Sequence, residues 1–393
     1  MRDPFPGPLS PEVREDPYPC FRWMQAERPV YYNSEGRYWA LSRYADVIAA
    51  ARNYSAFSSA QGAGLARTKG RTIMSTDPPD HTRLRKLVNH AFQAGAVEAM
   101  APRVAAIAHE LIDSSAGARG TFDLIQDFAV PLPLMVIAEL LGFDPARYDD
   151  YQKWSNTVSE FFNNPGSPDA LRQYYRDAPE FFSYLREVAE SRRHVPRGDL
   201  ISLMIQAREE RDALTVQEIA STCEFFLAAG NETTTGLIGN AALALSANPS
   251  EAAQVVRNPD LIPSLIEETA RFDSPFQGDF RTTTTAVTLH GVEIPIGAKV
   301  ALLWAAANRD PEVFAEPDLF MVTRNPNPHL GFGHGIHYCI GAPLARLEGR
   351  IAATVLLERF SYLAPDPNFP PVRRSTTPLL RGLRSLRMQF EMR

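Results

Sequence analysis

The sequence predicts a mainly α-helical protein with small β-sheets, folded as a single domain over residues 1–393. Apolar residues recur at helical spacing in five long segments, namely 99–111, 134–141, 171–190, 216–246 and 344–360. Alternating segments predict three hairpins, at residues 30–41, 285–303 and 379–392. Because strand segments occur near both ends and no repeat or long linker divides the chain, we expect both termini to pack onto one body.

The composition is that of an ordinary globular protein. With 45% hydrophobic residues, 393 residues can bury a large core. The net charge of −6 argues against nucleic acid or an anionic membrane as a partner. Prolines and charges interrupt the first twenty residues, so they predict neither a signal peptide nor a membrane anchor. Cys20, Cys223 and Cys339 are too far apart for a disulfide framework. We therefore expect a cytoplasmic protein, and a monomer.

The segment GFGHGIHYCIGAPLAR places Cys339 directly before a predicted helix. Pro343 suits the first turn of that helix. The free N–H groups and the dipole at a helix N-terminus favour thiolate over thiol. Gly333, Gly335 and Gly341 lack side chains, which would let a broad, flat group approach the backbone.

These residues alone leave several alternatives open for Cys339. A structural zinc site could use His334 and His337 with it, but no second ligand pair follows. A nucleophilic cysteine could use His337 as its base, but no further catalytic group can be assigned. A disulfide would need Cys20 or Cys223, both far away in sequence, whereas a buried cysteine in a turn would need no partner group.

The motif FGHGIHYCIG resembles the heme-binding signature of the cytochrome P450 family, with Phe332, Gly335, His337, Cys339 and Gly341 at the matching places. The resemblance implies heme b (iron protoporphyrin IX), held between a long central helix and the helix after the cysteine. Cys339 would be the axial ligand of the iron, with Phe332 packed beside the sulfur and His337 bonded to a propionate. A thiolate ligand favours cleavage of the O–O bond of dioxygen, so the resemblance implies a monooxygenase.

The central helix contains FFLAAGNETTTGLIGNAALAL, an apolar pattern with a polar interruption. We expect the Thr233 hydroxyl to donate to the Ala229 carbonyl, four residues back, and to widen that turn. An ordinary buried helix would show the same pattern. AGNET is similar to the family's acid–alcohol motif, which implies that Glu232 is the carboxylate of a proton path and Thr233 the hydroxyl at the oxygen-binding face.

Glu268 and Arg271 lie three residues apart on a predicted helix. The family has an E-x-x-R pair at this place, joined to a second arginine, for which Arg324 is the best candidate. The resemblance implies a structural role for this group.

Four basic side chains match the family's partners of the heme propionates. His81 and Arg85 lie four residues apart on one helix face, Arg281 opens the strand-like RTTTT, and His337 precedes the cysteine. Seen alone, His81 and Arg85 would equally fit a surface charge cluster.

The resemblance also implies the reaction and the partners. One atom of dioxygen would enter a mid-sized hydrophobic organic substrate by hydroxylation, epoxidation or O-dealkylation. A separate ferredoxin and its reductase would supply the electrons, because the heme domain uses the whole chain. Arg83, Lys86, Arg346 and Arg350 would form a basic docking patch or simply a solvated face.

The substrate pocket is predicted by position in the family. We expect two loops, at residues 58–74 and 163–169, to act as lids, and Arg67, Lys69 and Arg71 to meet either a substrate carboxylate or solvent. The expected substrate contacts are Met74, Phe161, Phe162, Phe225, Ala229, Phe276, Gln277 and Leu380. This largely apolar set fits a hydrophobic compound.

Two other functions remain open at this point. A heme-binding sensor without turnover would keep Cys339 but would have no use for Glu232 and Thr233. A heme enzyme of the same fold that is driven by peroxide would need no ferredoxin.

Overall fold

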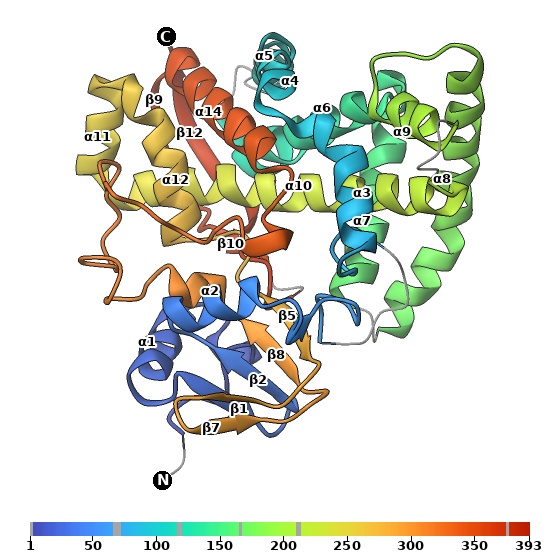
Figure 1. Cartoon of the computed structure of the whole chain (residues 1–393). Helices are drawn as coiled ribbons and strands as arrows, with labels where there is room; N and C mark the ends of the chain where they lie inside the picture. Colours follow the sequence, from blue (N-terminus) through green and yellow to red (C-terminus); the bar gives the residue numbers. More distant parts are fainter. Residues whose placement is uncertain (1–2, 66–71, 116–119, 165–166, 210–213, 375–376) are drawn as a thin grey trace.

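The computed structural model describes residues 3–65, 72–115, 120–164, 167–209, 214–374 and 377–393 (Figure 1). The described α-helices are α1 (Tyr18–Glu27), α2 (Tyr44–Arg52), α3 (Asp80–Asn89), α4 (Ala94–Glu98), α5 (Ala101–Ser115), α6 (Pro131–Leu141), α7 (Tyr148–Asn163), α8 (Pro168–His194), α9 (Leu200–Glu209), α10 (Val216–Ala247), α11 (Pro249–Arg257), α12 (Ile262–Phe272), α13 (Trp304–Ala307) and α14 (Ala342–Arg359). The described strands are β1 (Val30–Asn33), β2 (Tyr38–Leu41), β3 (Phe57–Ser58), β4 (Thr121–Asp123), β5 (Asp279–Thr283), β6 (Val287–Leu289), β7 (Val292–Ile294), β8 (Lys299–Leu302), β9 (Phe360–Pro365), β10 (Val372–Arg373), β11 (Leu383–Ser385) and β12 (Arg387–Met392).

The prediction of a mainly helical fold with small sheets is confirmed. The five long periodic segments are α5, α6, α8, α10 and α14. Helix α10 begins with a capping box. The Glu218 N–H donates to the Thr215 hydroxyl at 3.1 Å, and the Thr215 N–H donates to the Glu218 carboxylate at 2.8 Å. Periodicity therefore predicts these helices, and a capping box marks the start of α10.

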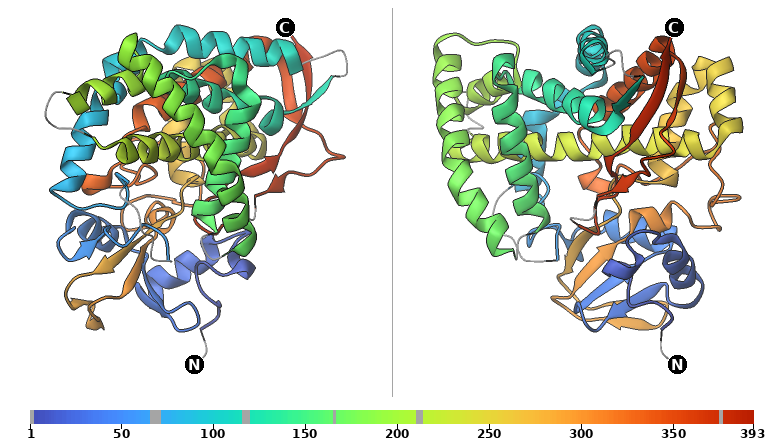
Figure 2. Two further views of the ribbon diagram at one scale, coloured as in Figure 1. Left: turned by 90° about the vertical axis from the view of Figure 1, so that its right-hand side faces the viewer. Right: turned by 180° about the vertical axis from the view of Figure 1, so that it is seen from behind.

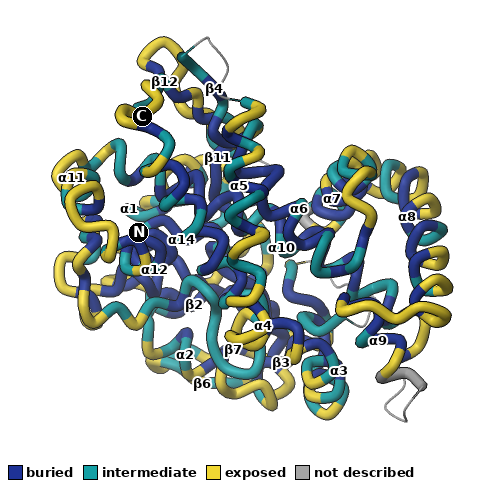
Figure 3. Tube along the Cα trace, turned by 90° about the horizontal axis from the view of Figure 1, so that it is seen from above, coloured by how far each residue is buried: buried dark blue, intermediate teal, exposed yellow. Residues whose placement is uncertain are grey.

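Helix α10 runs through the middle of the helical part, between α6, α7, α12 and α14 (Figure 1). Its residues from Thr234 to Ala241 are all buried, as expected of a helix that other helices surround. In the view from above, exposed residues follow the outer helices α8 and α11, whereas buried residues concentrate around α10 (Figure 3). No helix among the described residues is both long and apolar enough to cross a membrane.

A five-stranded sheet of order β1-β2-β8-β5-β3 lies below the helices in Figure 1. The hairpin predicted at residues 30–41 is β1 and β2, which pair antiparallel. The hairpin predicted in residues 285–303 is β6 and β7, while the end of that segment, β8, joins the larger sheet beside β2 and β5. We expect Arg281 at the start of a strand, but this is wrong: Arg281 lies in the middle of β5.

The hairpin predicted at residues 379–392 is wrong. Strand β11 pairs with β10, and β12 lies between β4 and β9, so the two do not pair with each other (Figure 2). Alternation predicts which residues form strands, but it does not say which strand each one joins. The pairing of β12 with β4 ties the C-terminal segment to the first half of the chain.

A buried ionic group joins α12 to the chain that follows it. The Glu268 carboxylate accepts from Arg271 at 2.8 Å and from Arg324 at 3.1 Å, which confirms the expected pair and its second arginine. Glu268 also accepts from the Met321 N–H at 2.9 Å and from the Asn327 amide at 3.2 Å. The Glu268 and Arg271 side chains have no exposed surface. Every oxygen of this buried carboxylate is thus hydrogen-bonded.

We predict that Glu268→Ala lowers the free energy of unfolding by about 3–5 kcal/mol, because it leaves two guanidinium groups buried without their carboxylate. Denaturation in urea measures the change. Glu190→Ala is the matched control: it removes an exposed ion pair with Arg193 and should cost less than about 0.5 kcal/mol. Equal losses for the two variants would contradict the structural role of the buried group.

Candidate active site

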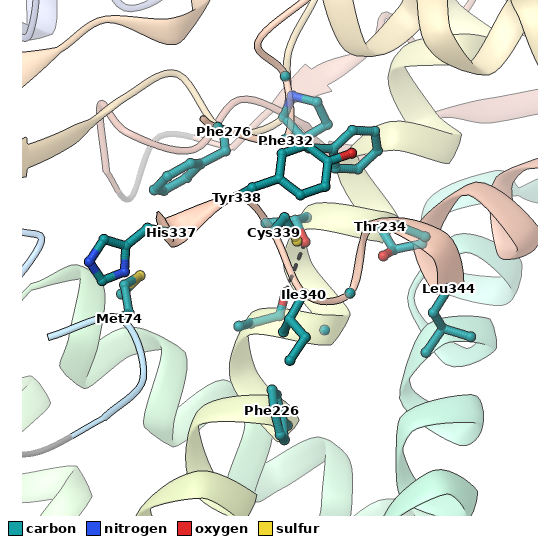
Figure 4. A pocket seen from close by; sticks show the side chains of 18 of the residues that line it. Met74, Phe226, Thr234, Phe276, Phe332, His337, Tyr338, Cys339, Ile340 and Leu344 are labelled. Carbon is teal, nitrogen blue, oxygen red and sulfur yellow. Dashed lines mark hydrogen bonds between the residues drawn. The ribbon is translucent and has the colours of Figure 1, made fainter. Parts of the chain in front are cut away.

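A large cavity lies between α10 and the segment that carries Cys339 (Figure 4). Its volume, the open mouth included, is about 1390 Å³. Phe226 and Ile137 contribute apolar walls on the helical side, and Trp304 lies on the sheet side. Cys339 and Thr233 line the same space from opposite elements. The two residues that the sequence singled out are thus brought to one cavity.

The backbone fixes Cys339 on both sides. Its N–H donates to the Phe332 carbonyl at 2.9 Å, and its own carbonyl accepts from the Ala342 N–H at 3.3 Å, where α14 begins. Pro343 lies in the first turn of α14, as predicted. The side chain of Cys339 is exposed to the cavity. Because the cavity lies inside the protein, the thiol has lost most of its surrounding water, and this desolvation raises its pKa. The backbone N–H groups of Gly341 and Ala342, together with Arg85 and Arg346, oppose that shift.

The Thr233 hydroxyl donates to the Ala229 carbonyl at 2.8 Å, so the predicted local hydrogen bond is confirmed. Helix α10 remains α-helical from Val216 to Ala247, and the expected widened turn does not interrupt it. Because the proton of the hydroxyl is held by the carbonyl, the oxygen of Thr233 presents lone pairs to the cavity.

Glu232 faces away from the large cavity. It lines a small adjacent pocket and forms an ion pair with Arg374, from the segment after β10. Its neighbours in that pocket include Thr235 and Leu380. Glu232 is not among the residues that line the large cavity, which sequence reasoning did not anticipate.

A second carboxylate, which sequence reasoning missed, does reach the large cavity. Glu348 of α14 lines it, is hydrogen-bonded to the Thr234 hydroxyl and is 2% exposed. Burial raises the pKa of the Glu348 carboxyl to about 8, and the bond from Thr234 only partly opposes that shift. The available signal was a charged residue on the apolar face of α14, four residues after Leu344.

Four basic side chains gather at one side of the cavity, as predicted. Arg85, Arg281 and His337 line it, and the His81 ring lies 4.4 Å from the His337 ring. The Nε2 atoms of both histidines are buried without a hydrogen-bond partner. Burial, together with the nearby arginines, lowers the pKa of His337 to about 2. Arg281 already pairs with the Asp279 carboxylate at 2.7 Å, and Arg85 donates to the Ile336 carbonyl at 3.0 Å. A carboxylate of a bound group would supply the partner that the two histidines lack.

The surroundings of Gly333, Gly335 and Gly341 show why each position is a glycine. A Cβ atom on Gly335 would lie 2.4 Å from the Ala51 carbonyl, so this glycine serves the close approach of α2 and not that of a cofactor. Gly333 has a φ of +70°, which favours glycine for the backbone itself. A Cβ on Gly341 would make an ordinary contact with the Cys339 sulfur, at 3.9 Å.

Half of the predicted substrate contacts line the large cavity: Met74, Phe225, Ala229 and Phe276. The other half do not line it. Phe161 stacks on Tyr174 at 4.3 Å, and its neighbour Phe162 is exposed. The Gln277 amide donates to the Ser274 carbonyl at 2.6 Å, and Leu380 lines the small pocket.

The basic patch is not free in the structure. Arg83 pairs with Glu218, Arg346 with Glu267 at 2.7 Å, and Arg350 with Glu98 at 3.2 Å. Lys86 is exposed. The lid residues Arg67, Lys69 and Arg71 lie outside the described residues, as do parts of both predicted lids.

The comparisons with known proteins show the family to which the chain belongs. The model of the family Cytochrome P450 matches residues 12–386. The chain belongs to the cytochrome P450 family. It is 43% identical to cytochrome P450 107B1 of Saccharopolyspora erythraea, over 82% of this chain and 78% of that protein. It is 39% identical to the cyclomarin C epoxidase of Salinispora arenicola, over 94% and 95%. The crystal structure of CalO2 matches it with a TM-score of 0.90 and 32% identity, over 98% of each chain.

Cytochromes P450 bind heme, and this chain is a monooxygenase of that family. The cavity fits the cofactor, because the Cys339 sulfur lies in one space with basic side chains, and the Nε2 atoms of His81 and His337 have no partner. Among the described residues, all three cysteines are free, and no three side chains of the kinds that hold zinc come together. The alternatives of a disulfide and of a zinc site thus find no support in the described part of the chain.

We predict that Cys339→Ser abolishes the red-shifted absorption band of the reduced, carbon monoxide-bound protein, because the sulfur ligand is lost. An absorption spectrum of the reduced protein under carbon monoxide measures it. Cys20→Ala is the matched control, because Cys20 belongs to a different core cluster, and it should leave the band unchanged. A band that survives in Cys339→Ser would show that another residue binds the iron.

We predict that Glu348→Gln stabilises the folded protein at pH 8 but hardly at pH 5. The carboxyl is protonated in the folded protein up to about pH 8, whereas in the unfolded chain it ionises above its ordinary pKa of 4.5. Between these values the unfolded chain binds fewer protons, so the free energy of unfolding of the wild type falls by roughly 1.4 kcal/mol per pH unit. Glutamine cannot ionise and avoids that loss.

Thermal unfolding midpoints of the two proteins at both pH values measure the effect. Glu187→Gln, at an exposed position of α8, is the control and should show no such difference. The same difference in midpoint between Glu348→Gln and wild type at pH 5 and pH 8 would contradict a raised pKa.

Proposed function

We propose that this monooxygenase inserts one atom of dioxygen into a mid-sized hydrophobic organic molecule, using heme b and electrons from a separate ferredoxin and its reductase. The proposal takes residues 1–393 as one heme domain, acting as a monomer in the cytoplasm. The observation that carries it is the placement of Cys339 and Thr233 on one cavity with mainly apolar walls. Heme with a thiolate ligand supplies the activation of dioxygen.

In this proposal Cys339 is the iron ligand, with Phe332 and Gly341 around it. His81, Arg85, Arg281 and His337 hold the two propionates. Their support is the cluster of basic side chains with unpaired nitrogens at one side of the cavity. These contacts orient the cofactor because each propionate needs cationic or donor partners once it leaves water.

Thr233 is proposed as the residue that controls protons at the oxygen-binding face. Its hydrogen is held by the Ala229 carbonyl, so its oxygen accepts a hydrogen bond from a proton donor in the cavity. Glu232, which directly precedes Thr233 in α10, is proposed as the carboxylate that delivers protons from the side of the small pocket. That role requires its ion pair with Arg374 to open, because a paired carboxylate is a poor proton carrier.

The substrate is proposed to be neutral where it meets the cavity. Met74, Phe225, Ala229 and Phe276 provide apolar contacts. Arg85, Arg281 and His337 are assigned to the heme, Asp279 is paired with Arg281, and burial raises the pKa of the Glu348 carboxyl to about 8. Such a wall favours hydroxylation, epoxidation or O-dealkylation of a hydrophobic compound. The epoxidase named among the relatives supports that range of reactions.

The electron donor is proposed to dock near Lys86 and the arginines around it. Because Arg83, Arg346 and Arg350 pair with carboxylates of this chain, the patch has less net charge than its composition suggests. An acidic partner would have to exchange those pairs for its own. A peroxide-driven enzyme would need neither the partner nor Thr233, and a sensor would need no substrate wall.

We predict that Thr233→Ala lowers the product formed per NAD(P)H by about tenfold and raises the release of hydrogen peroxide. The assay uses a ferredoxin, its reductase and a compound selected by its shift of the heme spectrum. Thr233→Ser keeps the hydroxyl and should retain most of the coupling. Unchanged coupling in Thr233→Ala, or full activity with peroxide alone, would contradict the proposal.

A further inference from the structure

Lys299, the first residue of β8, binds three backbone carbonyl oxygens of one short segment. Its Nζ atom lies 3.0 Å from the oxygen of Gln61, 3.2 Å from that of Gly62 and 3.0 Å from that of Gly64. The lysine is 9% exposed. An ammonium group has three N–H donors, and each of these three carbonyls can accept a hydrogen bond from it.

The charge makes this contact strong. A buried ammonium is costly unless it is hydrogen-bonded, and hydrogen bonds to charged groups stabilise more than those between neutral groups. Carbonyl oxygens surround a potassium ion in a similar way when they replace its water. The carbonyl between them, that of Ala63, accepts from the Phe280 N–H at 2.8 Å, so β5 holds the same segment from a second point.

The segment held by Lys299 is connected to the wall of the large cavity. Just before it, the Ser58 hydroxyl and the Ser59 N–H both donate to the Asp77 carboxylate, the latter at 2.9 Å. Asp77 follows Ile73 and Met74, which line the cavity. Residues 61–64 are therefore connected to that wall through the hydrogen bonds of Ser58 and Ser59 to Asp77.

We propose that Lys299 is a positioning residue for substrate: its ammonium acts as a built-in cation that fixes the carbonyls of residues 61–64 and thereby the Ile73–Met74 wall of the cavity. The inference rests on the proposed function in that it takes this cavity as the substrate site. Lys299 touches neither substrate nor cofactor in this account. Its effect is on how well a large molecule fits.

The first test is hydrogen exchange of the heme-loaded protein. Lys299→Met keeps an unbranched side chain, one atom shorter, but removes the ammonium, so exchange in a peptide covering residues 58–65 should become about tenfold faster. Lys299→Arg keeps the charge and should retain most of the protection. Lys153→Met, which removes an exposed lysine paired with Glu180, is the control and should leave the peptide unchanged.

The second test compares two azoles that bind heme iron and differ in size. Imidazole is small and should bind Lys299→Met within about twofold of wild type, because it does not reach the wall. Clotrimazole is bulky and should bind about tenfold more weakly, because it needs the Ile73–Met74 wall in place. Titrations followed by the heme spectrum give both affinities, and the thermal midpoint of each variant reports its overall stability.

Unchanged exchange and unchanged clotrimazole affinity in Lys299→Met would overturn the inference. So would an equal loss for both azoles together with a lower thermal midpoint, since that pattern reports general destabilisation. If Lys299→Arg behaves like Lys299→Met, the charge is not what fixes the loop, and the inference also fails. A wild-type protein without a heme spectrum would contradict the proposed function instead. Hydrogen exchange of residues 58–65 in that protein and in Lys299→Met would still decide whether Lys299 holds this segment.

Discussion

A cysteine that binds a metal has to be held by its backbone, because the side chain has only one rotatable bond before the sulfur. In this chain the turn from Phe332 to Ala342 provides that hold: the Cys339 N–H bonds back to Phe332, and its carbonyl meets the first N–H group of α14. Gly333 and Gly335 adopt positive φ angles within the turn, and Gly335 leaves room for the backbone of α2. The position of the sulfur is thus set by backbone bonds and close packing together.

The buried group around Glu268 supports this turn from the other side. Arg271 bonds to Glu268 and donates to the Asn308 carbonyl at 3.0 Å, and the Asn308 side chain accepts from the Leu330 N–H at 2.6 Å. Asn327 also bonds to Glu268. Helix α12 thereby fixes the chain directly before the cysteine turn. Such a buried ion pair is a weak source of net stability, but the penalty for breaking it keeps the segment in one arrangement.

The part of the site that could be predicted is the part whose contacts are local. The bond from Thr233 to Ala229 spans four residues of one helix, so residue type and spacing were sufficient to predict it. The partner of Glu232 is Arg374, 142 residues away, and the acceptors of Lys299 are more than 230 residues away. No local pattern encodes such pairs, and the same reason explains the wrong strand pairing at the C-terminal end. The resemblance of the cysteine motif to the family predicted the cofactor. The residues that contact the motif could be identified only from the folded structure.

The central claim is that the sulfur of Cys339 binds the heme iron opposite the face that carries Thr233. X-ray absorption at the iron edge of the purified protein tests it most directly, because sulfur scatters differently from nitrogen and oxygen. The account predicts one sulfur neighbour of the iron in the wild type and its loss in Cys339→Ser. A wild-type iron surrounded by nitrogen and oxygen atoms alone would contradict the account.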